Sequence, residues 1–160
     1  MRSERERRAD PPPRLSLSIQ LGPGAGRLPA ERAQLRRWVR GALDRDASLA
    51  LRLVGEAEAR ALNAGFRQRP YATNVLTFAY GEAHGHGPVQ ADIVICLPVV
   101  RREARAQRKP VRAHLGHLVV HGVLHALGMD HEDDAQARAM ESRETEILRR
   151  FRIDDPYRAR

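Results

Sequence analysis

The chain has 160 residues, the length of one domain, and its 42% hydrophobic residues suffice for an ordinary core. No apolar run approaches the roughly 20 residues that a membrane-spanning helix needs. The first residues are charged and rich in proline, unlike a secretory signal. Cys96 is the only cysteine, so an intrachain disulfide is impossible, which suits a reducing cytoplasm. We therefore expect a cytoplasmic protein, neither membrane-bound nor secreted.

The formal net charge is +8, from 28 basic and 20 acidic residues. All the basic residues except Lys109 are arginine. So uniform a preference resembles a genome-wide codon bias more than a basic surface built for binding. The charge is compatible with a polyanionic partner such as nucleic acid, but alone it does not decide for one.

Residues 1–14 are rich in arginine and proline and predict a disordered tail, followed by a single domain over residues 15–157. Within that domain, alternating or β-branched segments predict strands. Segments with apolar residues at helical spacing predict helices. The expected strands cover 15–21, 48–54, 74–78 and 91–97. The first expected helix has Pro29 in its first turn, and the second covers 56–63 and is ended by Gly65. The third opens at Pro98 and stops before Pro110. The last two cover 112–127 and 133–151. This order predicts an α+β fold: one mixed sheet of about four strands packed with about five helices.

The helix expected at 112–127 carries a row of histidines. At roughly 100° per residue, four of them fall within an arc about 80° wide. They are His114, His117, His121 and His125. Leucine and valine residues occupy the opposite arc. The sequence thus predicts a helix that is apolar on its back and rich in imidazole on its front.

His121 and His125 are four residues apart, so their imidazoles lie one above the other, about 6 Å apart along the axis, and can converge on one ion. Gly128 can then leave the helix with a positive φ, and His131 follows closely enough to swing back as a third ligand. Three imidazoles with an open fourth position are typical of a catalytic zinc site. We therefore predict one Zn²⁺ at the C-terminal end of this helix.

Zinc peptidases of the His-Glu-x-x-His type place a glutamate, the general base, directly after the first histidine. Their metzincin branch also has a third histidine at the spacing seen here. In this chain the position of the base is Gly122, which cannot accept a proton. The metal pattern matches these enzymes, but the base is missing.

The segment His121-Gly-Val-Leu-His125-Ala-Leu-Gly128-Met-Asp130-His131 resembles the signature of the YbeY family of zinc-dependent endoribonucleases. The resemblance extends in order over roughly residues 15 to 157. Further matching segments are Asn63-Ala-Gly-Phe-Arg67, Thr73-Asn-Val-Leu-Thr-Phe78 and Ala91-Asp-Ile-Val-Ile-Cys96, and Met140-Glu141 with Glu144 through Leu148 resembles the family's closing helix. Departures from the family pattern are Ala126 for Leu, Met129 for Tyr, Ala91 for Gly and Thr77 for Ser. Only the change at Met129 removes a hydroxyl that could bond near the metal.

The resemblance implies a cytoplasmic protein that cuts single-stranded RNA, matures the 3′ end of small-subunit ribosomal RNA, and supports ribosome quality control. It implies partners among ribosomal RNA and ribosome or small-subunit assembly proteins. It also implies that His121, His125 and His131 hold one zinc ion. The family's key arginine corresponds to Arg67, which we expect to be catalytic by binding the scissile phosphate.

Two alternatives stay open. One is a zinc-dependent peptidase or amidohydrolase of metzincin-like geometry, and the other is a non-catalytic ribosome assembly factor with a structural metal. No general base is evident. Asp130 and Glu132 flank His131, but they fit the role of outer partners of the ligands or of solvated surface groups equally well. His114 and His117 can serve ligand orientation, RNA contact or plain packing.

Overall fold

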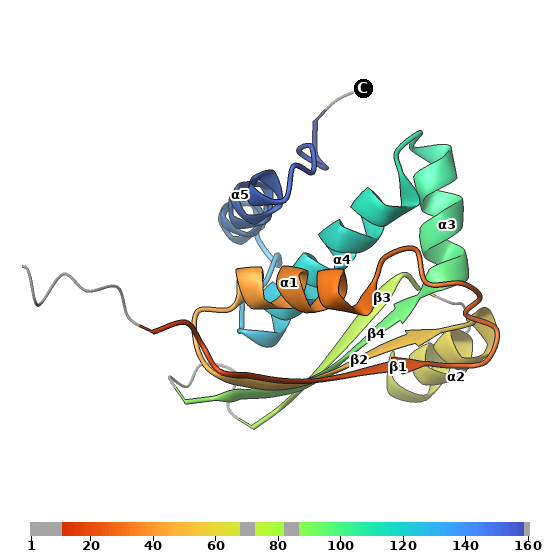
Figure 1. Ribbon diagram of the computed structural model, residues 1–160, viewed down its shortest axis with the longest axis horizontal. Coiled ribbons are helices and arrows are strands. Elements are labelled where there is room, and N and C mark those ends of the chain that lie inside the picture. The colour runs from red at the N-terminus through yellow and green to blue at the C-terminus, as the bar shows by residue number, and fades with distance from the viewer. Residues whose placement is uncertain (1–10, 68–72, 82–86, 159–160) are drawn as a thin grey trace, which may run out of the picture.

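The computed structural model describes residues 11–67, 73–81 and 87–158. These residues form a four-stranded sheet and five helices (Figure 1). The strands are β1 (Leu15–Leu21), β2 (Ala47–Val54), β3 (Val75–Tyr80) and β4 (Val89–Cys96). The helices are α1 (Arg32–Ala42), α2 (Glu56–Arg67), α3 (Leu97–Ala106), α4 (Val111–Ala126) and α5 (Asp134–Arg150). The predicted single domain with a mixed sheet is confirmed.

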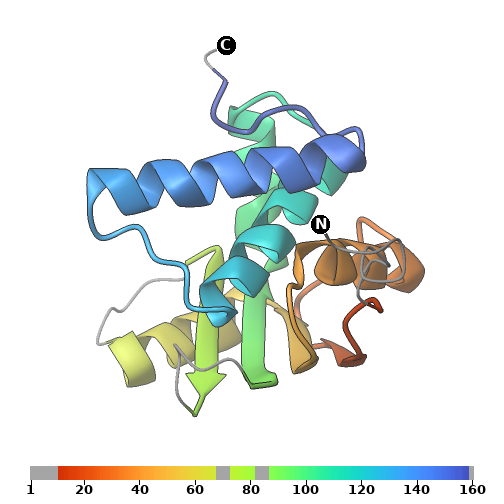
Figure 2. The same ribbon diagram turned by 90° about the vertical axis from the view of Figure 1, so that its left-hand side faces the viewer.

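The strand order in the sheet is β1-β2-β4-β3. β1, β2 and β4 run parallel, and β3 pairs with β4 antiparallel at the edge. Helix α2 covers one face of the sheet, while α1, α3 and α4 lie on the other (Figure 1). α5 lies across α4 on the side away from the sheet (Figure 2). α4 is therefore the central helix, in contact with the sheet and with three other helices.

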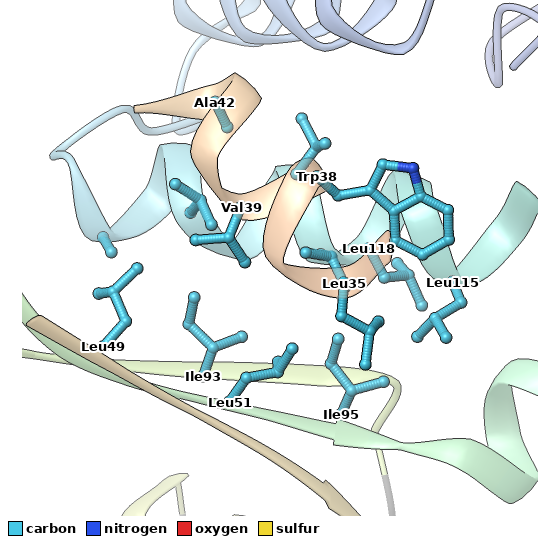
Figure 3. Close-up of a cluster of buried hydrophobic side chains, with 14 of the residues drawn as sticks. Leu35, Trp38, Val39, Ala42, Leu49, Leu51, Ile93, Ile95, Leu115 and Leu118 are labelled. Atoms are coloured by element: carbon cyan, nitrogen blue, oxygen red, sulfur yellow. The ribbon is translucent and has the colours of Figure 1, made fainter. Parts of the chain in front are cut away.

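The main core lies between the sheet, α1 and α4 (Figure 3). Leu51 and Ile93 point from the sheet toward Leu35 and Trp38 of α1, and Leu115 of α4 closes the layer. All five side chains are completely buried. Burying such large apolar side chains contributes about 1.5–3 kcal/mol each, so this layer fixes the position of α4 on the sheet.

Two predicted helix boundaries are wrong. Pro29 does not lie in the first turn of α1, because Glu31 is still extended and its carbonyl accepts the first helical bonds, from Gln34 and Leu35. Gly65 does not end α2, which continues to Arg67. Gly65 has no positive φ, so it does not form the left-handed cap that a terminating glycine supplies.

Some predictions fall outside the described residues. They include most of the expected tail, residues 1–10, and the histidines His84 and His86, which the sequence places in a surface loop. Among the helices that the structure describes, none has the length and apolar character needed to cross a membrane.

Candidate metal centre

The predicted histidine row runs along α4. Ring centres are 6.2 Å apart for His114 and His117, 6.2 Å for His117 and His121, and 5.9 Å for His121 and His125. The opposite face of α4 carries buried leucine and valine residues. The helix therefore presents imidazoles along one side because packing of its apolar side on the sheet fixes its rotation.

The chain leaves α4 at Gly128, as predicted, with a φ of 98°. The Gly128 N–H donates to the His125 carbonyl and the Met129 N–H donates to the Leu124 carbonyl, both at 3.0 Å. This pair of bonds is the Schellman pattern that ends many helices. It turns the backbone sharply, so that the following residues run back beside the last turn of α4.

This turn brings His131 next to the last two histidines of the row. The ring centre of His131 lies 5.8 Å from that of His121 and 5.6 Å from that of His125. The three rings thus form a nearly equilateral triangle at the C-terminal end of α4. The side chain of His131 is 52% exposed and that of His121 is 22% exposed, so the triangle opens toward solvent.

Each of the two helix histidines of this triangle has one ring nitrogen in a hydrogen bond. Nδ1 of His121 lies 2.5 Å from Oε1 of Glu144, and Nδ1 of His125 lies 2.8 Å from the Met129 carbonyl oxygen. A carbonyl oxygen only accepts, so Nδ1 of His125 carries the proton and Nε2 keeps its lone pair. The bond to Met129 comes from the backbone, and the missing tyrosine hydroxyl at this position does not affect it.

The donor chemistry of the triangle fits zinc. Imidazole nitrogen is a preferred zinc ligand, and three imidazoles bound at about 2.0–2.1 Å place ring centres roughly 5 Å apart. The observed separations of 5.6–5.9 Å are somewhat larger, so the three rings would have to draw together to hold an ion. The triangle is not among the groups of described residues whose ligand atoms already lie within 4.8 Å of one another. Acceptors at Nδ1 are the usual outer partners of zinc-binding histidines.

A second group of potential ligands overlaps the first. His117, His121 and Glu144 bring one ligand atom each within 4.8 Å of one another, and this group could hold a metal ion. Oε2 of Glu144 lies 2.9 Å from Nε2 of His117. The two groups share His121, so the potential metal ligands form one continuous row from His117 to His131.

Glu144 lies on α5 and is completely buried. Burial alone would raise the pKa of its carboxyl, but the hydrogen bonds from His117 and His121 outweigh burial and lower the pKa to about 2. Burial and the hydrogen bond to this carboxylate raise the pKa of Tyr157, whose hydroxyl donates to Oε2. The carboxylate is therefore ionised at neutral pH and accepts three hydrogen bonds.

The remaining histidine of the row serves packing. His114 is buried, and its Nε2 lies 3.0 Å from Oε1 of Glu103, which also accepts from the Asn74 amide at 3.1 Å. Burial lowers the pKa of His114, with Glu103 acting in the opposite direction. These contacts join α4 to α3 and to the start of β3.

Arg67 is the last residue of α2, and its side chain lies outside the described part of the chain. α2 itself is well anchored. Glu58 pairs with Arg52 of β2, and Glu56 pairs with Arg102 of α3. The helix that carries Arg67 is thus fixed to the sheet and to α3.

Sequence reasoning missed Glu144 and Tyr157. A signal for Glu144 was present, because Met140, Glu144, Ile147 and Leu148 follow the spacing of one buried helix face. A carboxylate within such an apolar stripe needs a buried partner. No comparable pattern marks Tyr157.

Comparison with known proteins shows to which protein family the chain is related. The family model described as endoribonuclease YbeY matches residues 28–152. The endoribonuclease YbeY of Cupriavidus pinatubonensis is 55% identical over 150 residues, covering 92% of this chain and 74% of the relative. That of Thiobacillus denitrificans is 52% identical over 145 residues, covering 91% and 97%. The solution structure of TM1509 from Thermotoga maritima matches with a TM-score of 0.55 and 28% identity, covering 89% of this chain and 99% of that one. The chain belongs to the endoribonuclease YbeY family.

Proposed function

We propose that this protein is a zinc-dependent endoribonuclease that cuts single-stranded RNA. The observation that carries the proposal is the triangle of His121, His125 and His131, with ring centres 5.6–5.9 Å apart at an open end of α4. The relatives named above are endoribonucleases by name, which supports RNA as the substrate.

The three histidines of the triangle would hold the ion. When bound, zinc supplies Lewis-acid chemistry, polarising a phosphoryl oxygen and making water more acidic. The chain's own residues prepare the site for it. The Met129 carbonyl and Glu144 hold Nδ1 of His125 and His121, which leaves each Nε2 available to a metal. His131 is half exposed, so the triangle is open to solvent on that side.

The choice between the two overlapping ligand groups can be tested by metal content. We expect His125→Ala to abolish stoichiometric zinc, measured by elemental analysis of the purified protein. His117→Ala should keep it, because His117 contacts Glu144 and is not one of the three proposed ligands. Zinc retained in His125→Ala and lost in His117→Ala would place the ion in the other group and refute the proposed ligand set.

Arg67 is proposed as the phosphate clamp. A guanidinium has a planar fork of donors that matches two phosphate oxygens, and lysine cannot reproduce it. We expect Arg67→Lys to lower RNA cleavage strongly while zinc content stays unchanged. The matched control is Arg60→Lys on the same helix, an exposed arginine paired with Glu56. Equal cleavage by both variants would refute the clamp.

The peptidase alternative meets a steric obstacle. A Cβ at Gly122 would lie 2.8 Å from Cγ2 of Ile93, so the position of the usual glutamate base faces the packed sheet. A protease assay run beside a single-stranded RNA assay separates the two activities. The alternative of a structural metal in a non-catalytic assembly factor is opposed by the half-exposed His131, since structural zinc sites are closed by four ligands.

The proposed biological role is cytoplasmic processing of ribosomal RNA, including 3′-end maturation of the small-subunit RNA, and ribosome quality control. Ribosomal RNA and the ribosome or small-subunit assembly proteins are the proposed partners. The net charge of +8 favours a polyanionic partner. The decisive assay uses a small-subunit RNA precursor with and without a zinc chelator. Cleavage that survives both the chelator and His125→Ala would overturn metal dependence.

A further inference from the structure

The carboxylate of Glu144 is the meeting point of three segments of the chain. It is contributed by α5 and is completely buried. Oε1 lies 2.5 Å from Nδ1 of His121, and Oε2 lies 2.9 Å from Nε2 of His117 and also accepts from the Tyr157 hydroxyl. A buried carboxylate is costly unless its oxygens are hydrogen-bonded, and here both oxygens are engaged.

The contact with His121 has a direct consequence for the ring. An ionised carboxylate only accepts, so it holds the proton of His121 on Nδ1 and leaves the lone pair on Nε2. It also fixes the rotation of the ring. Carboxylates in this position are a common outer partner of zinc-binding histidines. Glu144 reaches His121 at the ring nitrogen that the proposed metal does not use.

Tyr157 brings the C-terminal segment into this arrangement. After α5 the chain turns back on itself (Figure 2), and the Tyr157 N–H donates to Asp155 Oδ1 at 2.8 Å. The Tyr157 ring meets the His117 ring edge-on, with centres 5.3 Å apart. Tyr157 lies beyond residue 152, where the match to the family model ends. Its hydroxyl and His117 together hold one oxygen of Glu144, while the other oxygen faces His121.

We propose that Glu144 is a positioning residue for His121 and that Tyr157 holds Glu144 in place, which makes the C-terminal segment a working part of the metal centre. This inference rests on the proposed ligand set of His121, His125 and His131. It assigns Glu144 no direct bond to the ion. Its effect is to keep one imidazole in the tautomer and orientation that zinc requires.

The test measures zinc affinity by competition with a chromogenic chelator. Glu144→Gln keeps the shape of the side chain but removes its charge, and we expect affinity to fall about 10–100-fold, the usual cost of losing an outer partner. Tyr157→Phe removes only a hydroxyl and should cause a smaller loss, because His117 still holds the carboxylate. The matched control is Tyr80→Phe, which removes a hydroxyl bonded to Asp92 on the sheet and should leave affinity unchanged.

A second readout separates positioning from simple loss of structure. ¹⁵N NMR of the metal-free protein reports the tautomer of His121, which we expect to be protonated on Nδ1 in the wild type. In Glu144→Gln the ring should populate both tautomers, while Tyr80→Phe should match the wild type. Unchanged tautomer and unchanged zinc affinity in Glu144→Gln would overturn the inference, and unchanged affinity in Tyr157→Phe would remove the C-terminal segment from it.

The outcome of His125→Ala distinguishes this inference from the proposed function. If His125→Ala loses zinc and Glu144→Gln binds like the wild type, the ligand set stands and the positioning role of Glu144 falls. If His125→Ala keeps zinc while Glu144→Gln and His117→Ala lose it, Glu144 is itself a ligand, and both the inference and the proposed ligand set fall.

Discussion

The two helix histidines of the candidate centre are oriented by different means. His125 donates to the Met129 carbonyl, a backbone group fixed by the Schellman turn at Gly128. His121 contacts the Glu144 side chain, which comes from another helix. The orientation of His125 is therefore independent of the side chain at position 129. The orientation of His121 depends on how α5 packs on α4.

The three proposed ligands should contribute unequally to zinc affinity. His121 and His125 stay convergent on one rigid helix when His131 is removed, so we expect His131→Ala to bind zinc weakly but measurably. His125→Ala leaves His121 and His131 on separate segments and should show no binding. The loss in His131→Ala should exceed the roughly 10–100-fold cost of losing an outer partner.

Isothermal titration of the metal-free proteins with zinc checks this ranking. His131→Ala should keep the melting temperature of the metal-free wild type, because its side chain is 52% exposed and lies on a loop. Weaker binding in His131→Ala than in His125→Ala would contradict the ranking.

The sequence predicted the histidine triangle because its geometry is local. A spacing of four within a helix and a glycine just past its end determine where His121, His125 and His131 lie. Glu144 is separated from His121 by 23 positions, and no local sequence pattern predicts which face of α5 packs on which face of α4. A carboxylate in an apolar stripe signals that a partner exists, but only the packing of α5 on α4 identifies that partner.

At the scale of elements, α4 packs closely on the sheet at Gly122. Gly122 faces β4, and a Cβ there would lie 2.8 Å from Cγ2 of Ile93 and 3.6 Å from Oγ1 of Thr77. Ile93 is completely buried, and its β-branched side chain has little freedom to move. The glycine thus sets the distance between the histidine row and the sheet.

Substitution of this glycine should be destabilising. We expect Gly122→Ala to lower the free energy of unfolding by about 1–3 kcal/mol, the usual cost of overpacking a core. The matched control is Gly65→Ala on α2, where a Cβ would meet nothing within 4 Å. That change should be neutral or stabilise by about 0.5–1 kcal/mol, since alanine favours a helix.

Urea unfolding followed by circular dichroism measures both variants. Equal stability of Gly122→Ala and the wild type would show that the helix moves away from the sheet without cost. In that case zinc affinity should change instead, because the histidine row moves with the helix.

Strand order is the part of the fold that the sequence did not reveal. The alternating residues of β1 and β2 identify strands, but β4 pairs with β2 as well as with its chain neighbour β3, and the β2–β4 pairing joins segments far apart in the chain. Element boundaries were predicted well where periodicity or proline determined them, as at Pro98 in the first turn of α3. The predictions failed at Pro29 and Gly65, where contacts with neighbouring residues and the backbone angles determine where the helix begins or ends.

At the scale of the whole molecule, the core and the candidate metal centre are separate. The main hydrophobic cluster joins the sheet, α1, α4 and α5 through apolar side chains alone. The ligands lie along the outer side of α4 and on the loop before α5. Because apolar burial fixes α4 without help from an ion, the fold should persist when metal is removed.

Metal removal therefore gives the last prediction. A ligand present at 100 times its dissociation constant stabilises the native state by about 2.7 kcal/mol. For a chain of this size each kcal/mol shifts the melting temperature by about 2–4 °C, so a zinc chelator should lower it by about 5–11 °C. The far-UV circular dichroism spectrum should stay unchanged below the transition, and added zinc should restore the melting temperature. Loss of helical signal on chelation would instead mean that the metal is structural, and would favour the non-catalytic alternative over the endoribonuclease.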